Sequence, residues 1–308
     1  MQKLSFFYES KFDGKKIHAT KFIPEGEIIA VLQISHGMAE YFERYEDFAE
    51  FLCDKGIMVV GNDHRGHGQS VADENELGYF HKDNPTEALL DDIHTLTEII
   101  KSDYPDIPYF LLGHSMGSFF ARRYLCEYGE ALTGAVIMGT GCQPQIIVKM
   151  GKLLTKLIAL FKSDKHRSSL MQSIAFGSYN KRIDLKRTDM DWLSTDEATV
   201  DRYIADKLCG FNFTLNGFYG MFNCIDSLYS KKRLAQMPKS LPVLFVSGSE
   251  DPVGDYGKSV IKVKEMFVAS GVENTELKLY DSDRHEILNE VDKLTVFSDI
   301  YEWLVKTI

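Results

Sequence analysis

The sequence predicts an α/β protein built on one mostly parallel sheet. Short apolar runs, suited to strands buried on both faces, alternate with longer segments in which apolar residues recur at helical spacing. The alternation extends from residue 28 to residue 140 and resumes at residue 242. Such alternation is typical of parallel strands joined by right-handed helical crossovers. With 308 residues, 44% of them hydrophobic, the chain can bury one large core, or a core and a modest second lobe.

The first two strands are expected to form a hairpin. Residues 4–9 and 16–23 flank Asp13 and Gly14, a pair that favours the tight reversal between antiparallel strands. Six more apolar runs follow, which brings the expected number of strands to eight. The sheet is therefore predicted to be mostly, but not wholly, parallel.

Two buried strands and two helices come next. The runs 28–35 and 57–60 are nearly continuous in apolar residues, and a helix over 41–54 joins them. Gly56 is placed to end that helix. The next helix, 86–101, carries leucine and isoleucine along one face, which is typical of a helix packed against a sheet.

The fifth strand, residues 109–112, runs into a helix over 116–126, and a sixth strand is expected at 133–138. The same alternation returns near the end of the chain. There the expected elements are strands at 242–247 and 276–280 and helices at 256–269 and 291–305.

Residues 141–230 interrupt the alternation. The stretch is helix-prone and rich in turns, and it has no clear strand. We expect it to be an inserted helical cap over the carboxyl edge of the sheet, where open α/β sheets bind their ligands. The predicted organisation is a core of residues 1–140 and 231–308 and a cap, or lid, of residues 141–230.

A Gly-x-Ser-x-Gly pattern lies between the fifth strand and its helix. Gly113 and Gly117 flank Ser115, and a chain that reverses so sharply brings the two glycines close together, where a Cβ would collide. The turn lifts the serine hydroxyl clear of the sheet. The following helix aims backbone N–H groups at the place where negative charge would form. Ser115 is therefore the predicted nucleophile, and a serine that only caps the helix is the alternative.

A serine hydroxyl needs an imidazole to take its proton and a carboxylate to orient that imidazole. Asp251 follows the seventh strand and His285 the eighth, so both are expected at the sheet edge that presents Ser115. Glu250 and Asp255 are alternative acids, but Asp251 directly precedes a proline, in a turn that fixes its direction. Of nine histidines, only His285 follows a strand in the later half of the chain.

Two backbone N–H groups are expected to bind the oxyanion of an acyl-transfer reaction. One belongs to Met116, directly after the nucleophile. The other is expected from the loop after the third strand, where Met38 is the choice. Because backbone atoms bind the charge, the side chains at these two positions can differ freely.

The composition excludes several classes of protein. A formal charge of −10 argues against a nucleic-acid partner. The five cysteines are widely spaced, odd in number and form no CxxC pair, which fits reduced thiols. His64 and His67 would need further ligands to hold a metal, so no metal or cofactor is expected. The N-terminus lacks a signal-peptide pattern, and no apolar run reaches the roughly 18 residues of a membrane span, so we expect a cytoplasmic protein.

Four motifs and one late histidine occur in a characteristic order. They are HGMAEYFERY at 36–45, NDHRGHGQS at 62–70, GHSMGS at 113–118, SGSEDPV at 247–253 and His285. Together they resemble the monoacylglycerol lipase and lysophospholipase group of α/β-hydrolases. The resemblance implies the α/β-hydrolase fold and a serine esterase without cofactor that acts on monoacylglycerols or lysophospholipids. It also implies an apolar acyl tunnel under a helical cap, a triad of Ser115, Asp251 and His285, and oxyanion donors at Met38 and Met116.

Two departures from the pattern of that group lie beside the implied acyl-binding face. Close members often have Gly-Glu-His after the first His-Gly-Ala, where this chain has Met38-Ala39-Glu40-Tyr41. In addition, the Gly-x-Ser-x-Gly turn around Ser115 is followed by Ser118, where close members have a second glycine. These departures leave the size of the substrate open but not the type of reaction.

Three other functions share this scaffold. A peptidase that releases N-terminal residues would need carboxylates in the cap for the substrate amine, and Asp196, Glu197, Asp201 and Asp206 are candidates. A thioesterase or an acyltransferase would differ only in the leaving or accepting group. The third alternative is a catalytically silent ligand receptor, against which the complete set of serine, acid and histidine argues. The sequence leaves the oligomeric state open.

One helix of the expected cap, residues 146–162, is basic and amphipathic. Lys149, Lys152 and Lys156 recur at intervals of three and four residues and share one face, while apolar residues occupy much of the rest. Two arrangements are open. Either this helix lies at an anionic lipid surface, peripheral to the membrane, or it packs its apolar face on the core and leaves the lysines in water.

Overall fold

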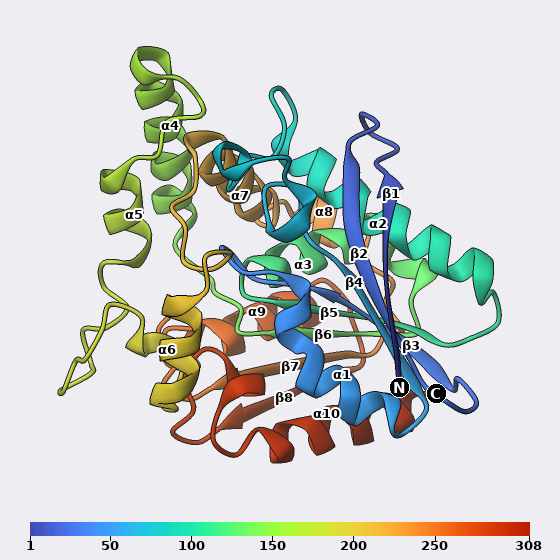
Figure 1. Ribbon diagram of the computed structural model, residues 1–308. Coiled ribbons are helices and arrows are strands. Elements are labelled where there is room, and N and C mark those ends of the chain that lie inside the picture. Colours follow the sequence, from blue (N-terminus) through green and yellow to red (C-terminus); the bar gives the residue numbers. More distant parts are fainter.

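Eight strands form a single sheet in the computed structural model, which describes residues 1–308 (Figure 1). The strands are β1 (Gln2–Glu9), β2 (Lys16–Ile23), β3 (Ala30–Ser35), β4 (Ile57–Asn62), β5 (Tyr109–His114), β6 (Gly134–Met138), β7 (Val243–Gly248) and β8 (Thr275–Tyr280). Their order across the sheet is β1-β2-β4-β3-β5-β6-β7-β8. β2 is antiparallel to both β1 and β4, and all other neighbours are parallel. The predicted α/β fold with a mostly parallel eight-stranded sheet is confirmed.

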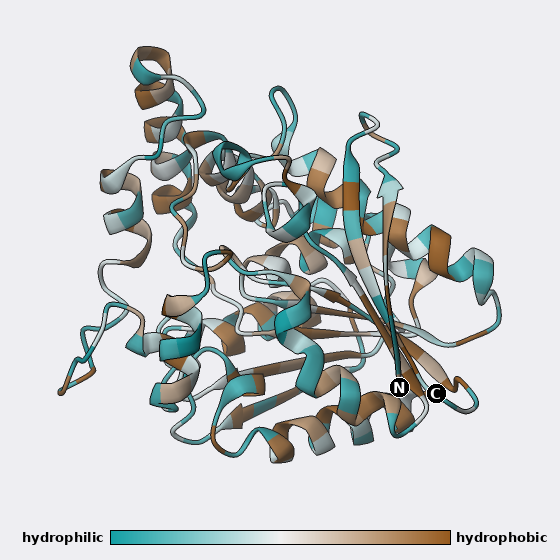
Figure 2. Cartoon of the chain, in the orientation of Figure 1, coloured by the Kyte–Doolittle hydropathy of each residue, from teal (hydrophilic) through white to brown (hydrophobic).

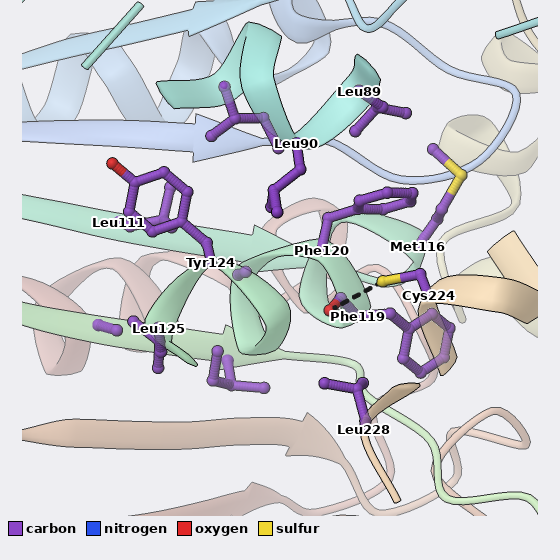
Figure 3. Packing of buried hydrophobic residues seen from close by; sticks show 14 of the residues in the cluster. Leu89, Leu90, Leu111, Met116, Phe119, Phe120, Tyr124, Leu125, Cys224 and Leu228 are labelled. Carbon is purple, nitrogen blue, oxygen red and sulfur yellow. Dashed lines mark hydrogen bonds between the residues drawn. The ribbon is translucent and has the colours of Figure 1, made fainter. Parts of the chain in front are cut away.

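Helices cover both faces of the sheet and create two cores. One face is covered by α2 (Pro85–Asp103), α3 (Met116–Tyr128) and α9 (Lys258–Ala269), the other by α1 (Glu46–Cys53) and α10 (Lys293–Thr307). Successive side chains of a strand point to opposite faces, so Leu111 of β5 packs in the first core and Phe110 and Leu112 pack in the second. Figure 3 shows part of the first core, to which α2 contributes Leu89 and Leu90 and α3 contributes Phe120 and Leu125.

The observed helices begin and end close to their predicted positions, with two differences. The helix expected over 41–54 consists of a 3-10 turn, Phe42–Tyr45, followed by α1. The helix expected from residue 256 begins at Lys258, because the three residues before it have φ angles of 47°, 57° and 84°. Such left-handed backbone cannot continue a right-handed helix.

Between β6 and β7 the chain forms helices and, apart from one isolated bridge between Arg167 and Thr214, no β-structure. The helices are α4 (Gln145–Lys162), α5 (Ser169–Phe176), α6 (Glu197–Ala205), α7 (Leu215–Ser227) and α8 (Lys231–Leu234). α7 packs against α2 and α3, and α4 packs against α7. α4 and α5 project away from the sheet (Figure 1). This inserted segment contains the stretch 141–230 that is expected to form a cap.

The five cysteines are all buried free thiols. Burial raises the pKa of the Cys53 and Cys126 thiols to about 11, so both stay protonated and poorly nucleophilic near neutral pH. None of the helices combines the length and the hydropathy that crossing a membrane requires.

Candidate active site

Ser115 lies in a strained turn between β5 and α3. Its φ of 52° and ψ of −118° fall in a sparsely populated region, which persists only where the surroundings impose it. The surroundings here are very close. A Cβ at Gly117 would lie 1.9 Å from the carbonyl oxygen of Ser35, and one at Gly113 would lie 2.5 Å from the Cβ of Ala121. Both flanking glycines are therefore needed for the turn, as the pattern predicts.

The structure brings Asp251 and His285 together from two loops. Nδ1 of His285 lies 3.0 Å from each carboxylate oxygen of Asp251. The carboxylate also accepts hydrogen bonds from the Val253 N–H (2.8 Å) and the Ser247 hydroxyl (3.1 Å). Both members of the pair are buried, Asp251 completely. The predicted orienting contact between acid and imidazole is present in the geometry.

Mutual stabilisation shifts the pKa of both partners. Burial opposes ionisation of Asp251, but the nearby His285 ring and the hydrogen bonds to the carboxylate outweigh burial and lower its pKa. Burial also opposes a charge on His285, yet the Asp251 carboxylate raises the pKa of the imidazole above its ordinary value. The pair is therefore suited to accept a proton on the ring while the carboxylate stays ionised.

Nε2 of His285 is the free end of this pair. It is buried and makes no hydrogen bond within the chain. Since Nδ1 donates its proton to Asp251, Nε2 carries the lone pair. Ser115 and His285 line the same cavity, although no hydrogen bond joins Ser115 Oγ to Nε2 in this structure. Geometry of this kind in a protein without substrate often tightens when a ligand binds.

The loop after β3 lies against the nucleophile turn. A Cβ at Gly37 would lie 3.2 Å from the Cβ of Ser115. The Gly37 N–H donates to Glu40 Oε1 (2.6 Å) and the Ala39 N–H to His67 Nε2 (3.3 Å), whereas the Met38 N–H has no partner within the chain. Met116 is the first residue of α3, so its N–H has no partner within that helix. The two N–H groups predicted as oxyanion donors are thus free to bind a ligand.

A buried charge network behind this loop was not predicted. Arg44 donates to Glu40 Oε2 (2.5 Å) and makes a bidentate pair with Glu286 (2.9 and 2.7 Å). Glu40 also accepts from the Tyr45 hydroxyl (2.8 Å), and His114 Nδ1 lies 3.3 Å from it. Glu40 is buried, which opposes its charge, but Arg44 and His114 hold its pKa well below the usual value. The network ties the loop after β3 to Glu286, the residue that follows His285.

Two cavities meet at Ser115 and Met38. One, of about 410 Å³, is partly polar; its lining includes Glu40, His285, Gln172, Asn180, Asn212 and Tyr203. The other, of about 490 Å³, is lined almost wholly by apolar side chains; they include Phe119, Ile147, Leu153, Leu154, Leu157, Ile174, Phe222 and Ile225. Most of the apolar lining comes from α4, α5 and α7.

The competing residues lie elsewhere. Glu250 lines a separate small cavity of about 110 Å³, and Asp255 is in the strained turn before α9. His64 and His67 are buried and lie near His36, with ring centroids 4.1 Å (His64) and 5.1 Å (His67) from that of His36. No group of three or more histidine, cysteine, aspartate or glutamate side chains is arranged to bind a metal ion.

Known proteins are similar to this chain in both sequence and fold. The monoglyceride lipase of Homo sapiens is 26% identical over 297 residues, which cover 95% of this chain and 88% of the relative. The monoacylglycerol lipase of Mycolicibacterium smegmatis is 26% identical over 297 residues, covering 95% and 94%. The crystal structure of a thermostable carboxyl esterase from Bacillus coagulans in complex with glycerol superposes with a TM-score of 0.91 at 27% identity, covering 100% of this chain and 99% of the other.

A family profile described as "Serine aminopeptidase, S33" matches residues 26–292, a range that runs from just before β3 to the start of α10. The match includes the nucleophile turn, the Asp251 and His285 loops and the inserted helices. The resemblance to monoacylglycerol lipases within the α/β-hydrolases, seen in the sequence motifs, is confirmed by the relatives. The chain belongs to the serine aminopeptidase S33 family of α/β-hydrolases.

Proposed function

We propose that this protein is a serine ester hydrolase that cleaves acylglycerol or lysophospholipid esters through an acyl-serine intermediate. The observation that carries the proposal is the meeting of two unlike cavities at Ser115. An ester with a long acyl chain and a polar alcohol has the same two-sided character. The apolar cavity suits the acyl chain, and the partly polar cavity suits the alcohol. The similar monoglyceride lipases support this substrate class.

In the proposed reaction, Ser115 Oγ attacks the ester carbonyl carbon while Nε2 of His285 takes the hydroxyl proton. Asp251 holds the ring in the required tautomer and stabilises the imidazolium. The N–H groups of Met38 and Met116 bind the oxyanion. The protonated His285 then gives its proton to the leaving alcohol. A water molecule, activated by the same nitrogen, attacks the acyl-serine and releases the fatty acid and the free serine.

We also assign residues 141–230 the role of a cap. Side chains of α4, α5 and α7 supply most of the lining of the apolar cavity, while the core supplies Ser115, Met116 and Phe119. A segment that closes over an acyl chain in this way would select substrates by length without taking part in the bond-making step. The Ser115 end and the α4 end of the cavity would then carry separate functions.

The aminopeptidase alternative receives no support from the four carboxylates that the sequence suggested. None of Asp196, Glu197, Asp201 and Asp206 lines either large cavity. Asp201 pairs with Arg187, and Asp206 accepts a hydrogen bond from the Tyr41 hydroxyl. A substrate amine beside Ser115 would therefore find none of these four acids to bind it.

The surroundings of α4 match neither of the two expected arrangements in full. Lys152 pairs with Asp226 of α7 at 2.8 Å, and Lys156 lies over the ring of Tyr219, 4.8 Å from its centroid. Lys152 and Lys156 therefore face α7, whereas Lys149 is exposed. α4 also exposes a set of large apolar side chains: Ile146, Ile147, Met150, Leu153, Leu157, Leu160 and Phe161. Figure 2 shows hydrophobic segments, in brown, along this helix.

We propose that this apolar side of α4 rests on a lipid surface, from which substrate acyl chains enter the adjoining cavity. Burial of apolar area would supply the binding free energy, so salt should weaken it little. Cosedimentation with neutral phosphatidylcholine vesicles tests this contact. Replacing Leu160 and Phe161 by aspartate should abolish binding, whereas replacing Lys152 and Lys156 by glutamate should not. The contact is refuted if the aspartate variant still sediments with the vesicles.

The proposed function is tested at Ser115. A fluorophosphonate should label Ser115, and Ser115→Ala should lower kcat on a p-nitrophenyl ester by about 10⁴-fold or more, as in other triad deletions. A chain-length series with and without an added alcohol acceptor then separates hydrolysis from acyl transfer. An active Ser115→Ala protein, or a label on another residue, would sink the assignment.

A further inference from the structure

Ala39 has an unusual backbone conformation in the loop after β3, which we call the oxyanion loop (residues 36–41). Its φ of 53° lies in the left-handed region, which a residue with a Cβ adopts only when its surroundings impose it. Ala39 is buried and directly follows Met38, whose N–H is a proposed oxyanion donor. Whatever imposes this conformation therefore also determines where that donor points.

Contacts from the core hold the first two peptide groups of the loop. His36 Nε2 accepts from the His64 N–H (2.9 Å), so its Nδ1 carries the proton and donates to the Gly37 carbonyl (2.8 Å). That carbonyl belongs to the same peptide group as the Met38 N–H. The next N–H, of Ala39, donates to His67 Nε2. Burial lowers the pKa of His67 to about 3, so this nitrogen stays an acceptor at neutral pH.

Contacts from the inserted segment hold the third peptide group. The Ala39 carbonyl accepts two hydrogen bonds, from the Tyr203 hydroxyl (3.0 Å) and from the Gly210 N–H (2.9 Å). Tyr203 is on α6, and its buried ring lies against the Arg44 guanidinium at 4.9 Å. Core and insertion thus grip Ala39 from two sides, His67 at its N–H and Tyr203 at its carbonyl.

We propose that Tyr203 is a positioning residue for the oxyanion hole. By binding the Ala39 carbonyl it keeps Ala39 in its left-handed conformation, and this conformation aims the free Met38 N–H at the oxyanion. The inserted segment would then complete the catalytic site as well as cover it. The inference rests on the proposed function, because an oxyanion hole is needed only if Ser115 attacks a carbonyl group.

The test is Tyr203→Phe, which removes one hydroxyl and keeps the ring. With a short soluble ester, kcat should fall about tenfold, less than the 10²- to 10³-fold cost of deleting a donor outright. KM should stay within about twofold, because binding of the substrate's uncharged carbonyl group depends little on the oxyanion hole. The Ki of an alkyl trifluoromethyl ketone, which forms an oxyanion on the serine, should rise by the same factor as kcat/KM falls. The affinity for an uncleavable ether analogue of the substrate should not change.

Tyr41→Phe is the matched control. The Tyr41 hydroxyl joins the same two segments through Asp206 (2.8 Å) but makes no hydrogen bond to Ala39. This variant should lower the melting temperature about as much as Tyr203→Phe while kcat stays within about twofold, because hydroxyls of similar partners contribute similarly to stability. In an Ala39→Gly background, Tyr203→Phe should cost less kcat, because glycine adopts a positive φ without strain.

Two results would overturn the proposal in a working enzyme. One is a Tyr203→Phe protein whose kcat and trifluoromethyl ketone Ki equal those of the original chain. The other is an equal loss of kcat in Tyr41→Phe, which would indicate general loosening. These results differ from those expected if the proposed function itself were wrong, which would also invalidate the inference about Tyr203. In that case the unmodified protein itself would turn over no ester and take no fluorophosphonate label at Ser115.

Discussion

The helices α2 and α4 have similar lengths, 19 and 18 residues, but use their apolar side chains in opposite ways. α2 buries its leucines and isoleucines, such as Leu89 and Ile93, against the sheet. α4 buries small or short residues, Gly151 and Thr155 among them, and leaves Phe161 86% exposed. The same amphipathic pattern thus serves packing in the core, whereas in the insertion it leaves large apolar side chains exposed.

The difference has a physical cause. Burial of a leucine or phenylalanine in the core stabilises the fold by about 1.5–3 kcal/mol, so such residues are needed for folding. Exposed apolar side chains contribute nothing comparable, and contiguous apolar patches on a surface mark binding sites. Residues of α2 should therefore affect stability, whereas the exposed residues of α4 should affect only what the protein binds. The following predictions test that division, from the largest expected effect to the smallest.

The Asp251–His285 pair at the carboxyl edge of the sheet should affect the hydrolysis rate of every ester, whatever its chain length. Asp251→Asn should lower kcat by about 10³- to 10⁴-fold, because an amide stabilises the wrong tautomer of the imidazole. Loss of the Asp251 charge should also move the acidic limb of the pH–rate profile of kcat/KM to lower pH, since that charge raises the pKa of His285. Glu250→Gln is the control, with rates expected within about twofold. A comparable loss in both variants would contradict the assignment.

Within the core itself, Phe120→Ala should lower the free energy of unfolding by about 3–5 kcal/mol, because this fully buried side chain would leave a cavity. Phe161→Ala removes the same group from α4, where it is exposed, and should change stability by no more than about 0.5 kcal/mol. Guanidinium denaturation of both variants measures the contrast. Equal losses would show that α4 is packed in solution.

Stability should fall as the pH drops below about 6.5. Burial lowers the pKa of His36, His64 and His67, so these rings stay neutral in the fold but take protons in the unfolded chain. His285 acts in the opposite sense, because its raised pKa adds stability below pH 6.5 that is lost as the pH rises through the folded pKa. Between pH 6 and 5 His285 is protonated in both states, and Asp283, whose pKa burial raises to about 7, offsets part of the effect by taking a proton in the fold. Each proton that the unfolded chain binds in excess corresponds to about 1.4 kcal/mol per pH unit, so the free energy of unfolding should fall across this range. Denaturant titrations at pH 7, 6 and 5 check this slope; a flat profile would contradict it.

The smallest effect is expected in the insertion. Leu157 of α4 lines the apolar cavity and is 45% exposed. Leu157→Ser should lower kcat/KM for a long-chain monoacylglycerol by about tenfold, the equivalent of losing one or two buried methylene contacts. Turnover of a short ester and the unfolding free energy should hardly change. An equal loss of kcat/KM on short and long esters would contradict the proposed division between the catalytic residues of the core and the inserted helices.

Sequence reasoning predicted the strands well because strands buried on both faces appear as continuous apolar runs. It placed Ser115, Asp251 and His285 at one edge because parallel strands end together. It did not find the Glu40–Arg44–Glu286 network, since that pairing joins residues 242 positions apart in the chain. The Glu40 and Arg44 spacing within HGMAEYFERY was the only signal available for it.

The direction in which α4 faces was also beyond the sequence. Periodicity shows that the lysine and apolar faces of a helix differ, but not which of them meets a neighbour. Asp226 and Tyr219 of α7 decide the matter by binding Lys152 and Lys156, and this contact turns the apolar face outward. A side chain pairs with its neighbours in space, and separation along the sequence does not reveal which residues those neighbours are.

By itself, then, the sequence determined the α/β alternation, the turn that exposes Ser115 and the loops that carry its partners. Each of these depends on local patterns, such as apolar period, glycine at a tight turn and residues just past a strand end. Only the tertiary structure decided that Tyr203, from the inserted segment, reaches the carbonyl of Ala39, and that α4 leaves its apolar face uncovered. Those features depend on contacts between distant segments, whose geometry is determined only when the whole chain has packed.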